Sequence, residues 1–385
     1  MLEDKQNMGP ELNKGTPEPK PWHRKTWLRI VALVIVVGML ASELLSRIVS
    51  SDALVISDNQ QTQTLIDSDL AEALKHPMEL SDAYRKAVYR QKLEEQRKEK
   101  LLTLGQKAEE QIADGEYRKA VSTLDELLGE VTEDEADIWQ LKIIRAQLLF
   151  SDGQKQKSEQ ACAEIIDAQM DEGGIAHFIR SLIHLADEDY APAREDILGA
   201  LDAGYPQEDI CDLHLAYCDY YLEDYESVLS YTAKAEEEGI SEKYDYTILY
   251  LNAMSQLQLG RYKDSIDSIT KLLGMEEEKD SDGSLLYYRG VCSLALEDYK
   301  SSIADFKAAQ EAGFGESKED GPKKTMLLYN LGVAYAGRGK PKKAKKYMQE
   351  VISRGDDETL AKAAQDLLDM YEEAEKAAGV QPDTE

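Results

Sequence analysis

Cysteine, basic side chains and long apolar runs are all scarce in this sequence. Four scattered cysteines among 385 residues are too few for a disulfide-stabilised scaffold. The 45 lysines and arginines are outnumbered by 75 aspartates and glutamates, which gives a formal net charge of −30. A nucleic-acid-binding protein needs a basic face that displaces counterions from phosphates, so we expect no nucleic-acid partner. The length allows two or three domains or one long repeat array.

Catalytic motifs are scarce as well. The sequence contains no G-x-S-x-G and no H-E-x-x-H, and no pair of carboxylates stands out from the acidic background. The stretch GVAYAGRGK from Gly332 has glycines at P-loop-like spacing, but Arg338 stands where the lysine is required and no strand precedes it. We therefore expect a protein that is not an enzyme and has no cofactor.

Two clusters imitate metal sites. Cys211, His214 and Cys218 share one face of a helix, and His184 lies on the helix one repeat earlier. A zinc site needs about four converging ligands, so packing residues are the favoured interpretation. The acidic stretch 278–283 resembles the front of a calcium loop, but an arginine stands where the closing bidentate glutamate is required. We expect no metal site.

One apolar run stands apart from the rest of the chain. From Trp27 to Ile48 there are 22 residues, about 33 Å as a helix, which is long enough to cross a bilayer. The run predicts a transmembrane anchor over 27–48. A cleaved signal peptide is the alternative, and it is disfavoured because no A-x-A arrangement of small residues follows the apolar core.

The charges around this run predict its orientation. Residues 20–29 carry Lys20, His23, Arg24, Lys25 and Arg29 and no acid. The positive-inside rule then places the N-terminus in the cytoplasm and the rest of the chain on the other side of the membrane. Residues 1–50 hold seven basic and five acidic side chains, which leaves 38 basic and 70 acidic for the remainder. Such a domain is repelled by anionic lipid and is expected to stand off the membrane.

Beyond a polar stretch and a long helix, the chain repeats itself. Compare GEYRKAVSTLDELL from Gly115, GRYKDSIDSITKLL from Gly260 and EDYKSSIADFKAAQ from Glu297. The third residue of each copy falls at Tyr117, Lys155, Tyr190, Tyr225, Tyr262, Tyr299 and Pro341, in steps of 35 to 42 residues. This period is typical of helix–turn–helix repeats.

Each copy predicts the same unit. A first helix of about 14 residues ends at a glycine or at a Glu-Asp pair, where the backbone must turn. A second helix begins near the aromatic residue and carries apolar residues at helical spacing, such as Ile266, Ile269 and Leu272. Neither helix can bury its apolar stripe alone, so neighbouring units must stack.

The copies resemble the tetratricopeptide repeat family from Leu101 to Ser353. In the last copy the residues at the family's packing positions are Leu331, Gly332, Tyr335, Gly339, Ala344 and Met348. Small residues fall in register with Gly332 in earlier copies, at Ala146, Ser181, Ala216, Ala253 and Gly290, and are expected to let the paired helices approach closely. The copies lack the family's usual proline at most repeat ends, and Lys155 replaces the aromatic residue in the second copy.

The expected fold class is all-α, a solenoid of about seven tetratricopeptide-like units plus a capping helix, behind one N-terminal transmembrane helix. The expected organisation is a cytoplasmic tail (1–26), an anchor (27–48), a flexible linker (49–80), a helical stalk (81–100), the solenoid with its capping helix (101–378) and a disordered tail (379–385). The capping helix is expected at 359–378, because that stretch is amphipathic and has no partner copy.

The resemblance implies a protein–protein interaction scaffold that binds a partner peptide or helix in a concave groove. Together with the lack of an N-x-[ST] acceptor among the five Asn, it also implies that the membrane is a bacterial cytoplasmic membrane. The groove candidates are apolar or aromatic residues of the first helices: Phe178, Leu182, Tyr217, Tyr220, Tyr250, Met254, Tyr287 and Tyr329. The alternative is that these residues pack against each other. The family's basic clamp for a C-terminal carboxylate is missing from this face.

The last copy is basic, unlike the rest of the chain. Its candidates for an electrostatic docking patch are Arg338, Lys340, Lys342, Lys343, Lys345 and Lys346. A solvated helix face that offsets nearby acids is the alternative interpretation. Two other functions stay open: a cytosol-facing receptor or adaptor on an organelle membrane, and an accessory ligand-binding domain of a cell-envelope complex.

Overall fold

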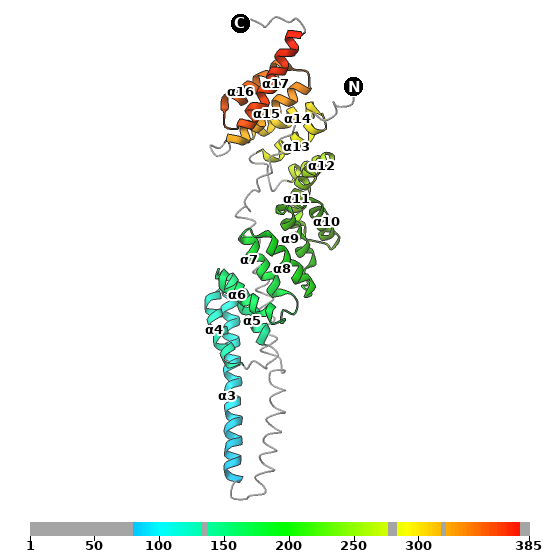
Figure 1. The fold of residues 1–385 in the computed structure, drawn as a ribbon. Coiled ribbons are helices and arrows are strands. Elements are labelled where there is room, and N and C mark those ends of the chain that lie inside the picture. Colours follow the sequence, from blue (N-terminus) through cyan, green and yellow to red (C-terminus); the bar gives the residue numbers. More distant parts are fainter. Residues whose placement is uncertain (1–79, 132–137, 276–282, 317–320, 378–385) are drawn as a thin grey trace. The chain divides into compact units, whose positions relative to one another are not determined.

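The computed structural model describes residues 80–131, 138–275, 283–316 and 321–377. These residues form fifteen α-helices, α3 to α17, and one 3₁₀ turn, and they contain no strand (Figure 1). The predicted cytoplasmic tail, anchor and linker, and the tail at 379–385, lie outside the described residues. None of the described helices combines the length and apolar character needed to cross a bilayer.

The described residues divide into two units, 80–211 and 212–377, and the boundary falls within α9. The N-terminal unit contains α3 (Leu80–Ala113), α4 (Tyr117–Glu130), α5 (Ile138–Ser151), α6 (Lys155–Asp167), α7 (Ile175–Ala186), α8 (Tyr190–Asp202) and the start of α9 (Glu208–Tyr221). The C-terminal unit contains the rest of α9, α10 (Tyr225–Glu237), the 3₁₀ turn η1 (Glu242–Tyr244), α11 (Asp245–Gln258), α12 (Tyr262–Gly274), α13 (Ser284–Ala295), α14 (Tyr299–Glu311), α15 (Gly321–Gly337), α16 (Pro341–Arg354) and α17 (Glu358–Ala377). Residues 81–100, predicted as a helical stalk, lie within α3.

Consecutive helices pack in pairs, as the repeat predicts. The most extensive contacts join α3 to α4, α5 to α6, α7 to α8, α11 to α12, α13 to α14 and α15 to α16. Helices α9 and α10 share a buried cluster that includes Ala216, Tyr220 and Val228. The seven register residues, Tyr117, Lys155, Tyr190, Tyr225, Tyr262, Tyr299 and Pro341, are the first residues of α4, α6, α8, α10, α12, α14 and α16. The predicted repeat register is therefore confirmed.

The turn within each pair needs a residue with positive φ. Four turns use glycine, with φ between 69° and 77°, at Gly115, Gly153, Gly260 and Gly339. The other three use glutamate with φ between 60° and 62°, at Glu188, Glu223 and Glu297. Each of these glutamates is followed by an aspartate at the N-cap of the next helix. Asp224 accepts a hydrogen bond from the Ser227 backbone N–H, and Asp298 accepts one from the Ser301 backbone N–H. The predicted equivalence of Gly and Glu-Asp at these turns is confirmed.

Small residues allow the two helices of a pair to approach closely. A Cβ atom on Gly290 would lie 2.7 Å from the Phe306 ring, and one on Gly332 would lie 2.4 Å from Cε of Met348. The residues in register with them, Ala146, Ser181, Ala216 and Ala253, are fully buried. The predicted role of these positions is confirmed.

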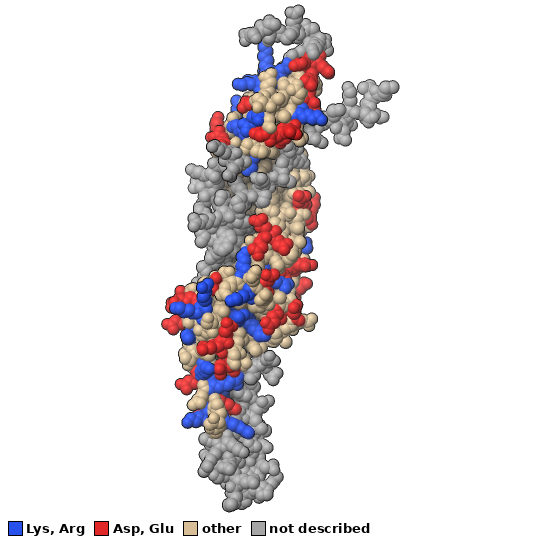
Figure 2. Space-filling model, turned by 60° about the vertical axis from the view of Figure 1, so that its left-hand side comes forward, with Lys and Arg blue, Asp and Glu red and all other residues tan. Residues whose placement is uncertain are grey.

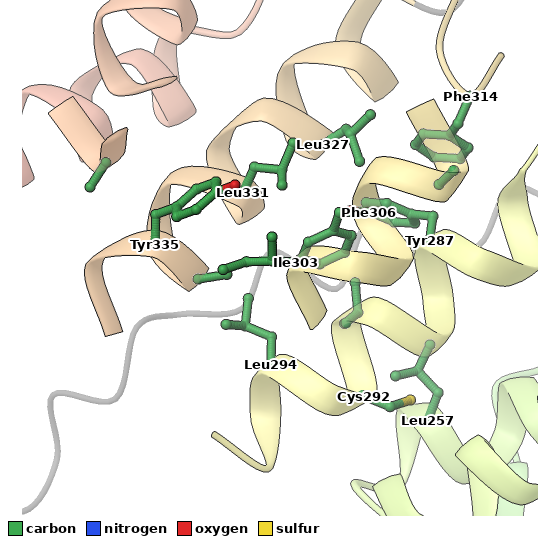
Figure 3. Close-up of a cluster of buried hydrophobic side chains, with 14 residues drawn as sticks. Leu257, Tyr287, Cys292, Leu294, Ile303, Phe306, Phe314, Leu327, Leu331 and Tyr335 are labelled. Carbon is green, nitrogen blue, oxygen red and sulfur yellow. The ribbon is translucent and has the colours of Figure 1, made fainter. Parts of the chain in front are cut away.

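Side chains from neighbouring pairs form successive core clusters within each unit. In the C-terminal unit, one cluster joins residues of α11 through α16, among them Leu257, Val291, Phe306 and Leu331 (Figure 3). A further cluster lies between α15, α16 and α17 and includes Leu360 of α17. Helix α17 thus covers the last pair, as expected of the capping helix.

Candidate functional site

Most of the groove candidates are core residues. Six of the eight are no more than 9% exposed: Phe178, Leu182, Tyr220, Met254, Tyr287 and Tyr329. Only Tyr217 and Tyr250 are half-buried. Phe178 and Leu182 belong to the N-terminal unit, and the other six belong to the C-terminal unit. The candidates that remain at a surface are therefore Tyr217 and Tyr250.

Two of the buried candidates have evident packing partners. Phe178 stacks on Tyr205 with ring centroids 4.3 Å apart. Tyr287 stacks on Phe314 at 4.4 Å (Figure 3). The Tyr287 hydroxyl accepts a hydrogen bond from Nδ2 of Asn330 at 2.9 Å. Burial raises the pKa of Tyr287 well above its usual range. These rings stabilise the fold.

Tyr217 and Tyr250 belong to a larger group of tyrosines on α9, α11 and α13. We define the tyrosine surface as the half-buried residues Tyr217, Tyr221, Tyr246, Tyr250 and Tyr288, all of which pack against one cluster of the C-terminal unit. The sequence analysis missed three of them, Tyr221, Tyr246 and Tyr288. The abundance of tyrosine, 21 residues against four phenylalanines, is the signal that could have revealed them.

The tyrosine surface is held together by ring contacts. The Tyr217 hydroxyl donates a hydrogen bond to the Tyr221 hydroxyl at 3.1 Å, and their ring centroids lie 4.8 Å apart in an edge-to-face arrangement. Tyr246 and Tyr250 stack with centroids 6.4 Å apart. Beneath them, burial raises the pKa of Tyr220, with smaller contributions from neighbouring tyrosines. Such rings offer a large contact area, a polar tip and little conformational entropy to lose, which suits binding of a protein segment.

The second candidate surface lies at the turn into α16. We define the basic patch as Arg338, Lys340, Lys342, Lys343, Lys345 and Lys346, as the sequence analysis proposed. All of these side chains are exposed except that of Lys345, which is half-buried. Figure 2 shows Lys and Arg side chains, with Asp and Glu side chains among them, on the part of the C-terminal unit that Figure 1 labels α15, α16 and α17.

Many basic residues elsewhere in the repeats contact acids. Ion pairs join Arg118 to Asp152, Lys142 to Glu164, Arg145 to Asp125, Lys155 to Asp187, Arg180 to Asp196, Lys234 to Asp212, Arg261 to Glu226, Arg289 to Asp305 and Arg354 to Asp356. The Arg180 and Arg289 pairs, at 2.6 Å and 2.7 Å, join the two helices of a repeat at equivalent positions. The hydrogen bonds from these arginines to their aspartates raise the pKa of both guanidinium groups.

The cysteine–histidine cluster is part of the core. Cys211 and Cys218 are fully buried and His214 is 7% exposed. Burial lowers the pKa of His214 to about 4, so this imidazole is neutral near pH 7. His184 instead lies 3.5 Å from a carboxylate oxygen of Asp196. Across the described ranges, no three His, Cys, Asp or Glu side chains are grouped so that they could hold a metal ion.

The protein is an α-helical repeat solenoid by class. Its helical pairs recur at a period of about 37 residues, the chain turns within each pair at a residue with positive φ, and a capping helix covers the last pair. Residues 250–317 match the family described as tetratricopeptide repeat. The matched segment runs from α11 through α14, and the same register recurs in the other helical pairs of the described residues. No curated protein matches the sequence.

Several solved structures are similar to this chain. One is a tetratricopeptide repeat protein from Parabacteroides merdae, with 13% identity, 70% of this chain and 98% of that chain covered, and a TM-score of 0.42. Another is the C-terminal part of a TPR repeat-containing protein from Cytophaga hutchinsonii, with 11% identity, coverage of 67% and 98%, and a TM-score of 0.46. A third is YrrB, a TPR protein with an unusual peptide-binding site, with 17% identity, coverage of 63% and 97%, and a TM-score of 0.29.

Proposed function

We propose that this chain is a membrane-anchored, non-catalytic interaction scaffold that binds a peptide or helix of a partner protein. Residues 27–48 anchor it, with the N-terminus inside and the repeats outside a bacterial cytoplasmic membrane. The observation that carries the proposal is the tyrosine surface, which gathers five half-buried rings on three successive first helices. The net charge of −30 argues against nucleic acid as the partner.

The physical basis for binding is the chemistry of these rings. Tyr217 and Tyr250 keep part of their surface in solvent while their neighbours fix their orientation. Anchor residues of protein interfaces have this combination of rigidity, apolar area and a hydrogen-bonding tip. A partner segment would bury the remaining ring area and bond to the hydroxyl groups.

Site-specific photocrosslinking in membranes tests the tyrosine surface. A photoreactive phenylalanine analogue replaces Tyr250, and the matched control places it at Leu296, which is 39% exposed at a turn of the same unit. We expect one dominant protein adduct from position 250 and none of the same mass from position 296. Adducts only within the chain would contradict the proposal.

Substitution of the rings provides the second arm of the test. The double variant Tyr217→Ala, Tyr250→Ala is expected to lose the adduct formed from a crosslinker at Tyr246, while helicity and melting temperature stay close to those of the parent. The double Phe variant at the same positions keeps the rings and is expected to retain most of the capture. A double Ala variant that unfolds would assign both tyrosines to the core.

Cysteine labelling tests the proposed topology. The four native cysteines are all buried and free, so they give little background with a membrane-impermeant maleimide. A cysteine in place of the exposed Lys119 is expected to react in intact cells, and one in place of Gln6 only after lysis. The reverse pattern would favour a cytosol-facing receptor or adaptor.

A further inference from the structure

The basic patch carries an inference that is independent of the tyrosine surface. We propose that it binds a short acidic segment of a partner polypeptide, as a second docking site on the last repeat. The proposal starts from the density of cations in this segment, which places six basic residues between 338 and 346. In a chain with 75 acidic and 45 basic residues, every exposed cation has many possible acidic partners. Yet Arg338, Lys340 and Lys346 form no ion pair in the part of the chain that the structure describes.

The position of the patch favours the binding of an anion. Lys342 and Lys343 lie in the first turn of α16, where the helix dipole is positive, and Lys346 lies in the second turn. The first turn contains no acid, and Lys340 at the N-cap makes no side-chain capping bond. Like charges at neighbouring helical positions repel one another as well. A bound carboxylate would reduce both the unfavourable interaction of the lysines with the helix dipole and the repulsion between them.

Aromatic rings hold two of the lysines in place. Nζ of Lys343 lies over the Tyr335 ring, 5.1 Å from its centroid, and Nζ of Lys345 lies 5.9 Å from that of Tyr371. Tyr335 in turn stacks on Tyr347 with centroids 5.6 Å apart. Because these contacts restrict the lysine side chains, fewer rotamers are lost when an anion binds.

The size of the patch selects a short acidic peptide over larger anions. Residues 341–346 span only about 9 Å of helix, which an extended peptide covers with about three residues. The Debye length at physiological salt is about 8 Å, so the patch attracts an anion locally while the acidic remainder of the chain is screened. A nucleic acid or an anionic bilayer extends much farther, and would bring its charge against the acidic residues around the patch.

Fluorescence polarisation with a labelled hexaglutamate peptide tests the proposal on the full-length protein in detergent. The variant removes three exposed charges, as Lys340→Gln, Lys343→Gln and Lys346→Gln. The matched control removes three exposed lysines of the N-terminal unit, as Lys107→Gln, Lys119→Gln and Lys157→Gln. We expect saturable binding by the parent, a Kd raised about tenfold by the patch variant and changed less than about twofold by the control. Binding should also weaken between 50 and 300 mM salt.

Three results would overturn the proposal. One is no saturable binding of hexaglutamate by the parent protein at low salt. Another is an equal loss of affinity in the patch variant and the control, which would make net charge the cause. The third is tighter binding to phosphatidylserine vesicles or to duplex DNA than to hexaglutamate. Circular dichroism of both triple variants shows that the fold is retained.

Discussion

Replacing Glu297 by glycine is expected to stabilise the protein, although it removes a side chain and adds no contact. Glu297 is exposed at the turn between α13 and α14 and has a φ of 60°. A residue with a Cβ atom pays about 1–2 kcal/mol in the left-handed conformation. Glycine avoids that strain but loses about 0.5–1 kcal/mol more through its freedom in the unfolded chain. The difference is a net gain of about 0.5–1 kcal/mol.

Denaturant unfolding followed by circular dichroism measures this gain. For a unit of this size, about 0.5–1 kcal/mol corresponds to a rise in melting temperature of about 1–4 °C. Repeat arrays depart from two-state unfolding, so the comparison uses the transition midpoint of each variant under identical conditions. The reciprocal change, Gly260→Ala, forces a Cβ atom into a turn with φ 73° and should lower the midpoint by a similar or larger amount.

The variants Glu297→Gln and Glu297→Ala separate backbone strain from charge. Both keep the strained backbone, and both remove one negative charge from an acidic chain. If either stabilised the protein as much as Glu297→Gly, relief of charge repulsion would explain the gain and the strain argument would fail. In all three variants Asp298 remains at the N-cap of α14.

Three further outcomes follow from the structure. Gly290→Ala should destabilise the protein by about 1–3 kcal/mol, because the new Cβ would lie 2.7 Å from the Phe306 ring. Adding Phe306→Leu to this variant should restore part of the lost stability. An unchanged denaturation midpoint for Gly290→Ala would contradict the close approach of the two helices. The pKa of His214 is lowered to about 4, so the unfolded chain binds more protons between pH 6.5 and 4. Stability should therefore fall by about 2 kcal/mol from pH 7 to pH 5, and His214→Leu should lack that component of the pH dependence. Arg289→Ala should cost about 2 kcal/mol by leaving the 13%-exposed Asp305 carboxylate unpaired, and a double-mutant cycle with Asp305→Ala should show coupling between the two residues.

The repeat register could be predicted from the sequence because the signals for it are local. Three kinds of residue recur at nearly constant spacing: the first residue of each second helix, the turn residue before it, and a small residue on the preceding helix. Each of them determines the local structure through contacts with residues close to it in the sequence. Glu297 could even be equated with Gly260, since both occupy the one position where the backbone turns with positive φ.

The exposure of the groove candidates could not be predicted in the same way. Tyr217 and Tyr287 occupy the same helix face by sequence, yet one is half-buried and the other is 2% exposed. Phe314 stacks on Tyr287 and lies in the segment after α14. That segment has no helical periodicity from which the contact could be predicted. The basic patch was easier to find, because a run of charged residues on a helix stays exposed whatever packs beneath it.

The division into hairpins has a mechanical consequence. Contacts run mainly between helices adjacent in the chain, so a repeat depends on its immediate neighbours and on little else. A chain held at one end and pulled at the other would yield hairpin by hairpin, and each event would release about 35 residues, or about 120 Å of extended backbone. The protein would then lengthen in steps under load and refold piecewise when the load is removed.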